Sequence, residues 1–122
     1  MADDATRVFH DTARAVRTSP EKMQKVNLFE SPRMFCDVYA LLPGQAQKAH
    51  AHAGSDKIYH VLAGTATVRI GEVTHALGPG ELAVAPAGVE HGVSNEGELP
   101  TSLLVVMAPH PSFGPPSPPE KA

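Results

Sequence analysis

The sequence has few features of an exported, membrane-spanning or nucleic-acid-binding protein. Its single cysteine, Cys36, cannot form an internal disulfide, which favours a reducing, cytoplasmic setting. No apolar run approaches the ~20 residues of a membrane-spanning helix, and the start at Met1 lacks the basic and apolar regions of an export signal. Lysines and arginines do not cluster, and the net charge is −3. We therefore expect neither a nucleic acid nor a membrane as a partner.

No segment with helical periodicity is long enough to form a helix that covers a parallel sheet, which argues against an α/β fold. Short apolar segments instead alternate with glycine- and proline-containing turns, a pattern typical of an all-β sandwich or barrel. The length of 122 residues favours one domain with a modest core. The expected strands are 34–42, 49–53, 58–63, 66–70, 73–77, 82–85, 91–95 and 102–107.

Two turns in this region have specific sequence signatures. Gly71-Glu72 suits a two-residue hairpin loop, because glycine occupies the first central position. The segment Gly78-Pro79-Gly80-Glu81 suits a type II turn, with proline and then glycine at its two central positions. Together they predict a hairpin between 66–70 and 73–77, followed by a tight turn into the next strand.

The two ends of the chain differ from the middle. Residues 1–19 are expected to form an N-terminal arm, in which Val8-Phe9 is able to add an edge strand, here or in a neighbouring subunit. Residues 20–108 are expected to form the β-barrel. The tail, 109–122, holds six prolines in fourteen residues, so it cannot supply regular strand hydrogen bonds, and we expect it to be disordered or extended.

Histidines occur in two spaced patterns within the predicted strands. The first pattern contains His50 and His52, which point the same way if residues 49–53 form a strand. The second contains His91 shortly after the Pro86-Ala87-Gly88 turn. Written with their spacing, the patterns are Gly44-x5-His50-x-His52 with Gly64 downstream, and Gly80-x5-Pro86-x-Gly88-x2-His91-x3-Asn95. Gly88 and Asn95 are better explained as turn and loop formers than as catalytic groups.

This pair of patterns resembles the two conserved motifs of the cupin superfamily, in its compact, single-domain (type-2) form. The resemblance implies a cupin jelly roll, which is a double-stranded β-helix barrel, with a metal site in its mouth. It also implies that His50, His52 and His91 are metal ligands. Members of the superfamily are often homodimers, so we expect a homodimer here as well.

The sequence departs from the cupin pattern at the glutamate of the first motif. Counted back from Gly64, this position holds Lys57, and counted forward from His52 it holds Asp56. The apolar run 58–63 favours Lys57 inward and Asp56 near the rim, because strand side chains alternate between faces. A bulge before this run would reverse the two. A protonated lysine has no lone pair to donate, so the expected ligands are three neutral histidines and water.

Three imidazole nitrogens suit a divalent transition metal ion, namely Zn, Ni, Fe, Cu or Mn, and leave positions open for water or substrate. Loss of the carboxylate favours Zn, Ni or Cu over Mn. Burial of Lys57 beside a cation should lower the pKa of its amine, which could then act as a base or bind an anionic substrate oxygen. Tyr59 shares a face with Lys57, and either lines the site or packs in the barrel. Lys57 and Tyr59 are thus the candidate catalytic residues.

Two functions fit these features. The first is a metal-dependent enzyme of the oxygenase, isomerase or lyase type that acts on a small organic molecule bound in the barrel. The second is a non-catalytic domain that binds or senses a metal or small molecule. No further acid and base pair is evident in the sequence, and the fold alone cannot decide between the two.

Overall fold

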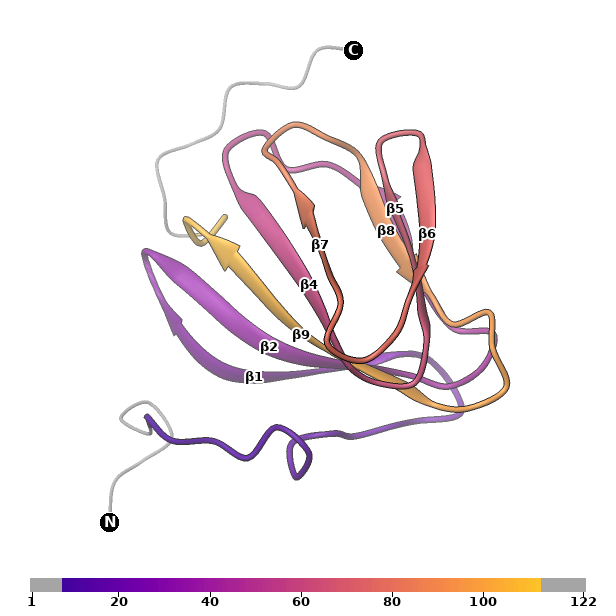
Figure 1. The fold of residues 1–122 in the computed structure, drawn as a ribbon. Helices are drawn as coiled ribbons and strands as arrows, with labels where there is room; N and C mark the ends of the chain where they lie inside the picture. Colours follow the sequence, from indigo (N-terminus) through magenta and orange to yellow (C-terminus); the bar gives the residue numbers. More distant parts are fainter. Residues whose placement is uncertain (1–7, 113–122) are drawn as a thin grey trace.

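The computed structural model describes residues 8–112, and this part of the chain contains nine strands and no helix. Figure 1 shows them wrapped into a barrel that is open at one end. The strands are β1 (Gln24–Ser31), β2 (Met34–Leu41), β3 (Ala46–His50), β4 (Asp56–Ala63), β5 (Ala66–Ile70), β6 (Val73–Leu77), β7 (Leu82–Ala85), β8 (His91–Ser94) and β9 (Thr101–Ala108). Accordingly, none of the described residues belongs to a helix that could cross a membrane.

The strands form two antiparallel sheets that face each other. The larger sheet has the order β1-β2-β9-β4-β7, and the smaller has the order β3-β8-β5-β6. Neighbours such as β4 and β9 are far apart in sequence, as expected when a chain winds between two sheets. The predicted all-β jelly roll is therefore confirmed.

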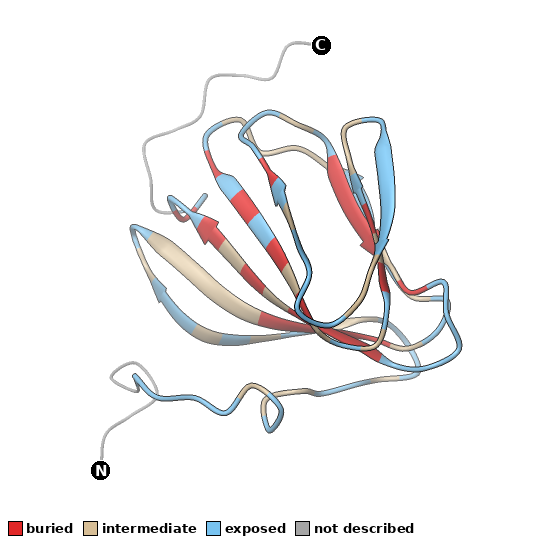
Figure 2. Cartoon of the chain, viewed as in Figure 1, coloured by how far each residue is buried: buried red, intermediate tan, exposed pale blue. Residues whose placement is uncertain are grey.

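Apolar side chains fill the space between the two sheets. On β4, Tyr59 and Val61 are fully buried, whereas Ile58 on the opposite face is 36% exposed. Figure 2 shows this alternation as successive buried and exposed bands along β4. The buried cluster continues across both sheets and comprises Tyr39, Leu41, Tyr59, Val61, Ala66, Val68, Val93, Leu103 and Val105.

Both predicted turns are present. Ile70 pairs with Val73, so Gly71-Glu72 is the two-residue loop of the β5–β6 hairpin. In the following turn the Glu81 amide donates to the Gly78 carbonyl at 3.0 Å, and Gly80 has a φ of 88°, which a type II turn requires at its third residue.

The strand predicted over residues 49–53 is wrong in its second half. Strand β3 ends at His50, and His52 lies in the loop that leads to β4. The pairing of β3 with β8 ends at His50 and His91, so residues beyond His50 have no strand partner there. The carbonyl of His52 is instead satisfied by the Gly88 amide at 2.8 Å.

The ends of the described chain lie outside the two sheets. Val8-Phe9 forms no strand, and Val8 and Phe9 are 74% and 88% exposed. The arm contains a turn in which the Asp11 carboxylate accepts a hydrogen bond from the Ala13 amide at 3.0 Å. Pairing of the arm with a neighbouring subunit stays a prediction, and most of the predicted tail, residues 113–122, lies outside the described residues. The segment just after β9 is held at the barrel by Ser55, whose hydroxyl donates to the Pro109 carbonyl at 2.8 Å.

Candidate metal centre

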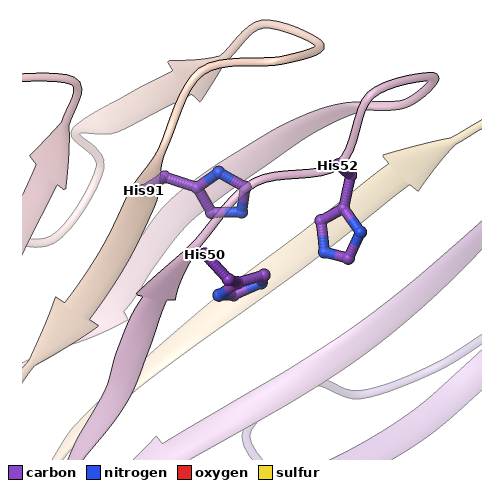
Figure 3. Close-up of side chains that lie close together, drawn as sticks. All are labelled: His50, His52 and His91. Atoms are coloured by element: carbon purple, nitrogen blue, oxygen red, sulfur yellow. The ribbon is translucent and has the colours of Figure 1, made fainter. Parts of the chain in front are cut away.

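The three predicted ligand histidines meet at the open end of the barrel. Their candidate ligand nitrogens all lie within 4.8 Å of one another. The ring centroids of His50 and His91 are 4.5 Å apart, and the ring of His52 lies 4.8 Å from that of His50. Figure 3 shows the three rings turned toward a common point from β3, from β8 and from the loop after β3. The structure thus brings together side chains that are separated by up to 41 positions in the sequence.

Backbone carbonyls orient two of the three rings. Nδ1 of His50 lies 2.8 Å from the Lys48 carbonyl, and Nδ1 of His91 lies 2.9 Å from the Val89 carbonyl. A carbonyl only accepts, so each Nδ1 carries the proton and each Nε2 keeps its lone pair. Fixing the tautomer and the ring orientation in this way is typical of histidines that bind metals.

The loop position of His52 is fixed by the turn that precedes β8. The backbone of this turn makes two contacts across to the first motif: the Gly88 amide donates to the His52 carbonyl, and the Ala87 amide donates to the Asp56 carboxylate at 2.9 Å. Asp56 therefore has a positioning role at the rim, which the sequence patterns did not reveal. The two motifs thus hold each other in place through one backbone hydrogen bond and one to the Asp56 carboxylate, without help from the ligand side chains.

Asn95 makes a second connection between the motifs, at the other end of β8. Its side-chain amide donates to the Leu41 carbonyl at 2.9 Å and to the Leu99 carbonyl at 2.8 Å, and its backbone carbonyl accepts from the Gly44 amide at 2.9 Å. This buried asparagine stabilises two loops, in agreement with its interpretation as a loop former.

Gly92 permits the close approach of β3 to β8 beside the ligands. A Cβ added at Gly92 would lie 3.0 Å from the Gln47 carbonyl oxygen and 3.1 Å from Cα of Ala49. The register between the two strands shifts at this point, between Gln47 and His50. A side chain at position 92 would therefore push against the backbone of β3 just before His50. Gly92 was not among the predicted site residues, although its place directly after His91 could have indicated a close approach of two strands.

Two of the three histidines have a lowered pKa, which favours the neutral form that metal binding requires. Burial, followed by the nearby His50 and Lys57, lowers the pKa of His52 from 6.5 to about 4. Burial also lowers the pKa of His91, although the hydrogen bond with the Val89 carbonyl opposes this effect. At neutral pH these two rings therefore offer lone pairs to an ion without first losing a proton.

Lys57 points into the barrel and is 1% exposed, whereas Asp56 is exposed at the rim. The pairing of β4 with β9 is regular from Asp56 through Val61, so no bulge reverses the register before residue 58. Gln47 connects the inward groups, since its side-chain carbonyl accepts from the Lys57 ammonium at 3.3 Å and from the Tyr59 hydroxyl at 3.1 Å. Both candidate catalytic residues thus lie on the inner face, and Tyr59 also contacts His91 with ring centroids 6.0 Å apart.

The ionisation of these groups is strongly shifted. Burial, and then the positive charge of Lys25, lowers the pKa of Lys57 from 10.5 to about 8, while Asp37 acts in the opposite direction. Burial raises the pKa of Tyr39 to about 12 and that of Tyr59 further still. Near neutral pH, Lys57 is the group of this network that most readily exchanges a proton.

The donor set fits a divalent transition metal ion. Among the described residues the group that could hold an ion consists of three histidines and no carboxylate. Nε2 of His91 is buried and has no hydrogen-bond partner. A buried nitrogen lone pair without a partner is unfavourable, and coordination of an ion would satisfy it. Imidazole ligands suit Zn, Cu, Fe and Ni.

Comparison with known proteins agrees with the fold and the motifs. The family model described as "Cupin domain" matches residues 37–107. Protein SchB from Streptomyces halstedii is 31% identical over 83 residues, which are 66% of this chain, and the match spans only 60% of the length of SchB. The crystal structure of TT1209 from Thermus thermophilus is 53% identical, with a TM-score of 0.81, and the match covers 88% of this chain and 98% of TT1209.

A second solved structure extends the likeness to a more distant protein. It is an uncharacterized conserved protein with a double-stranded beta-helix domain from Klebsiella pneumoniae, 28% identical, with a TM-score of 0.77 and coverage of 85% of this chain and 90% of that one. The family match includes strands β3 and β8, the loop that carries His52, and the turn that positions this loop. The chain therefore belongs to the cupin family.

Proposed function

We propose that this protein is a metal-dependent enzyme of the oxygenase, isomerase or lyase type, acting on a small organic molecule bound at the three histidines. The observation that carries the proposal is the convergence of three imidazoles, one of which has a buried Nε2 without a hydrogen-bond partner among the described residues. Three protein ligands and open coordination positions are typical of catalytic rather than structural metal sites.

His50, His52 and His91 would hold the ion, which we propose to be Zn, Ni, Fe, Cu or Mn. Such an ion supplies Lewis acidity, and Fe, Ni or Cu supplies redox chemistry as well. Gln47 keeps the two candidate catalytic side chains in place, since it accepts hydrogen bonds from both Lys57 and Tyr59. The Lys57 amine, with a pKa of about 8, is able to take up or release a proton, or donate to an anionic substrate oxygen, near neutral pH.

The direct test is turnover by protein loaded with each of these ions in turn. Oxygen consumption and substrate loss would be followed with a panel of 1,2-diols, diketones and thiols. We expect turnover with at least one loaded form, and its loss in His91→Ala and in chelator-treated protein. Turnover that survives both treatments would contradict the proposal.

The second candidate is a non-catalytic domain that binds or senses a metal or small molecule. One observation favours it: Lys57, which cannot bind a metal while protonated, occupies the carboxylate position of the first motif. Spectroscopy of the Co-substituted protein separates the candidates, because a closed coordination sphere that excludes added azide favours the binding domain. A sphere that exchanges water for azide favours the enzyme.

The predicted homodimer and the cytoplasmic setting stay proposals. The outer face of the larger sheet supports the dimer, since Ile58, Leu82 and Val84 are 36%, 53% and 49% exposed on adjacent strands β4 and β7. Apolar side chains grouped on one face are typical of protein–protein contacts. Light scattering of the wild-type protein and of Val84→Glu would test it, because a dimer formed through this face should dissociate in the variant.

A further inference from the structure

Among residues 8–112, the ammonium group of Lys57 forms no ion pair. Its side chain is 1% exposed, and its hydrogen-bond acceptor is the neutral Gln47 amide at 3.3 Å. In the described part of the chain, no carboxylate oxygen lies within 4.0 Å of this ammonium. Lysines are rarely buried to this extent without an anionic partner, because loss of hydration penalises the charge. At least one N–H of the ammonium also remains available to a further acceptor.

A second lysine approaches the same place from the open edge of the larger sheet. Nζ of Lys57 lies 5.4 Å from the centre of the Tyr39 ring, and Nζ of Lys25 lies 5.3 Å from it. Lys25 pairs with Tyr39 across β1 and β2, and its side chain is exposed to solvent. Both ammonium groups thus lie beside the same aromatic ring, one on a buried side chain and one on an exposed side chain.

Two acidic groups face inward near this pair of lysines, and neither forms an ion pair with them: Glu30, opposite Phe35, instead contacts His110 at 2.9 Å. Asp37 accepts a hydrogen bond from the Asn27 side-chain amide at 2.8 Å, and it forms no ion pair with Lys25 or Lys57. The carboxylates of Asp37 and Glu30 match the charges of the two lysines, and an ion at the histidines would add two positive charges to this end of the barrel. This end of the barrel therefore favours a negatively charged ligand.

We propose that the site binds a small organic dianion of the dicarboxylate class, with one oxyanion on the histidine-bound ion and the other on the ammonium groups of Lys57 and Lys25. This inference rests on the proposed metal-dependent function for its first contact only. The second contact belongs to the lysine pair and is independent of the metal. Lys57 and Lys25 would then determine which ligands bind, rather than whether the ion binds.

The test is calorimetric binding of acetate, malonate, succinate and glutarate to the Zn-loaded protein. We expect at least one dicarboxylate to bind about tenfold or more tightly than acetate, the gain expected of a charge-assisted hydrogen bond in a dry site. The variant Lys57→Met should lose this preference, and Lys25→Gln should reduce it severalfold. Lys22→Gln removes the same charge from an exposed position just before β1 and should keep the wild-type preference.

Parallel measurement of Zn affinity, by competition with a chromophoric chelator, separates this inference from the proposed function. Unchanged Zn binding in Lys57→Met and Lys25→Gln, together with lost dicarboxylate preference, supports the lysine site. Zn binding without any dicarboxylate preference overturns the lysine site and leaves the metal site intact. Failure to bind Zn overturns the proposed function, and the lysine site is then tested in metal-free protein, where Lys25→Gln must still weaken dicarboxylate binding. Because Lys25 is exposed, its variant tests the inference even if Lys57→Met fails to fold.

Discussion

Replacement of Lys57 by methionine should make the protein more stable at neutral pH. Methionine keeps most of the length and apolar volume of the lysine stem but carries no charge. Lys57 is 1% exposed and lacks an anionic partner among the described residues, so the folded state must hold its ammonium group away from water. A residue that costs stability but lies beside a candidate site fits a functional role better than a structural one.

The size of the effect follows from the pKa of Lys57, which falls from 10.5 to about 8 on folding. One pKa unit corresponds to ~1.36 kcal/mol, so holding the charged form inside costs about 3 kcal/mol at pH 7. The variant loses the hydrogen bond to Gln47, which contributes ~1 kcal/mol to the free energy of unfolding. We therefore expect the free energy of unfolding to rise by about 1–2 kcal/mol.

The pH dependence gives the effect a distinctive sign. Between pH 8 and 10.5 the unfolded chain holds the Lys57 proton while the folded chain has released it, so wild-type stability gains from this group as the pH rises. The advantage of Lys57→Met should accordingly shrink by about 2 kcal/mol between pH 7 and pH 9.5. Other groups that titrate in this range are common to both proteins, so they cancel in the difference.

Urea unfolding of both proteins at pH 7 and pH 9.5 measures this difference directly. Lys48→Met is the matched control, because Lys48 is exposed on β3 and its loss should change stability little at either pH. A Lys57→Met protein that is less stable than wild type by more than about 1 kcal/mol at pH 7, or a difference that is the same at both pH values, would refute the reasoning.

Three further predictions concern the metal centre. Gly92→Ala should weaken Zn binding by about tenfold or more in a chelator competition, because the new Cβ would push β3 and its His50 away; an unchanged affinity would contradict this. Removal of the ion by a chelator should lower the melting temperature by about 10 °C or more at saturating metal, since the ion binds only the folded chain; equal melting temperatures would argue against a preformed site. The metal-free protein should lose stability as the pH falls from 6.5 toward 4, because the unfolded chain then takes up the proton that folded His52 resists; thermal melts of His52→Asn should show a shallower pH dependence, and an equal slope would count against it.

The strands and turns were predictable because their signals are local. The apolar run Ile58–Ala63, counted back from Gly64, predicted the register that turns Lys57 inward, and the order Gly-Pro-Gly at Gly78–Gly80 specified its turn. The convergence of the histidines was predictable only through the resemblance to the cupin motifs. Nothing local to His91 shows that it lies beside His50.

The parts that escaped prediction depend on contacts between distant segments. His52 lies in a loop because β8 ends the pairing of β3 at His50, and the rim carboxylate of Asp56 has its partner in the Ala87 amide. The place of Gln47 between Lys57 and Tyr59 likewise follows from the packing of one sheet on the other. Residue type and spacing specify which side chains face inward, but they do not specify what those side chains touch.

The proposed function requires that His50, His52 and His91 share one metal ion. The direct measurement is the metal content of protein produced without a histidine tag, by elemental mass spectrometry, for the wild type and for single alanine variants of His50, His52 and His91. We predict close to one divalent transition metal ion per chain in the wild type and a clear loss in each variant, with the exposed His75 as the control that changes nothing. Wild-type protein that retains no ion under any loading condition, or variants that all bind as well as wild type, would contradict the central claim.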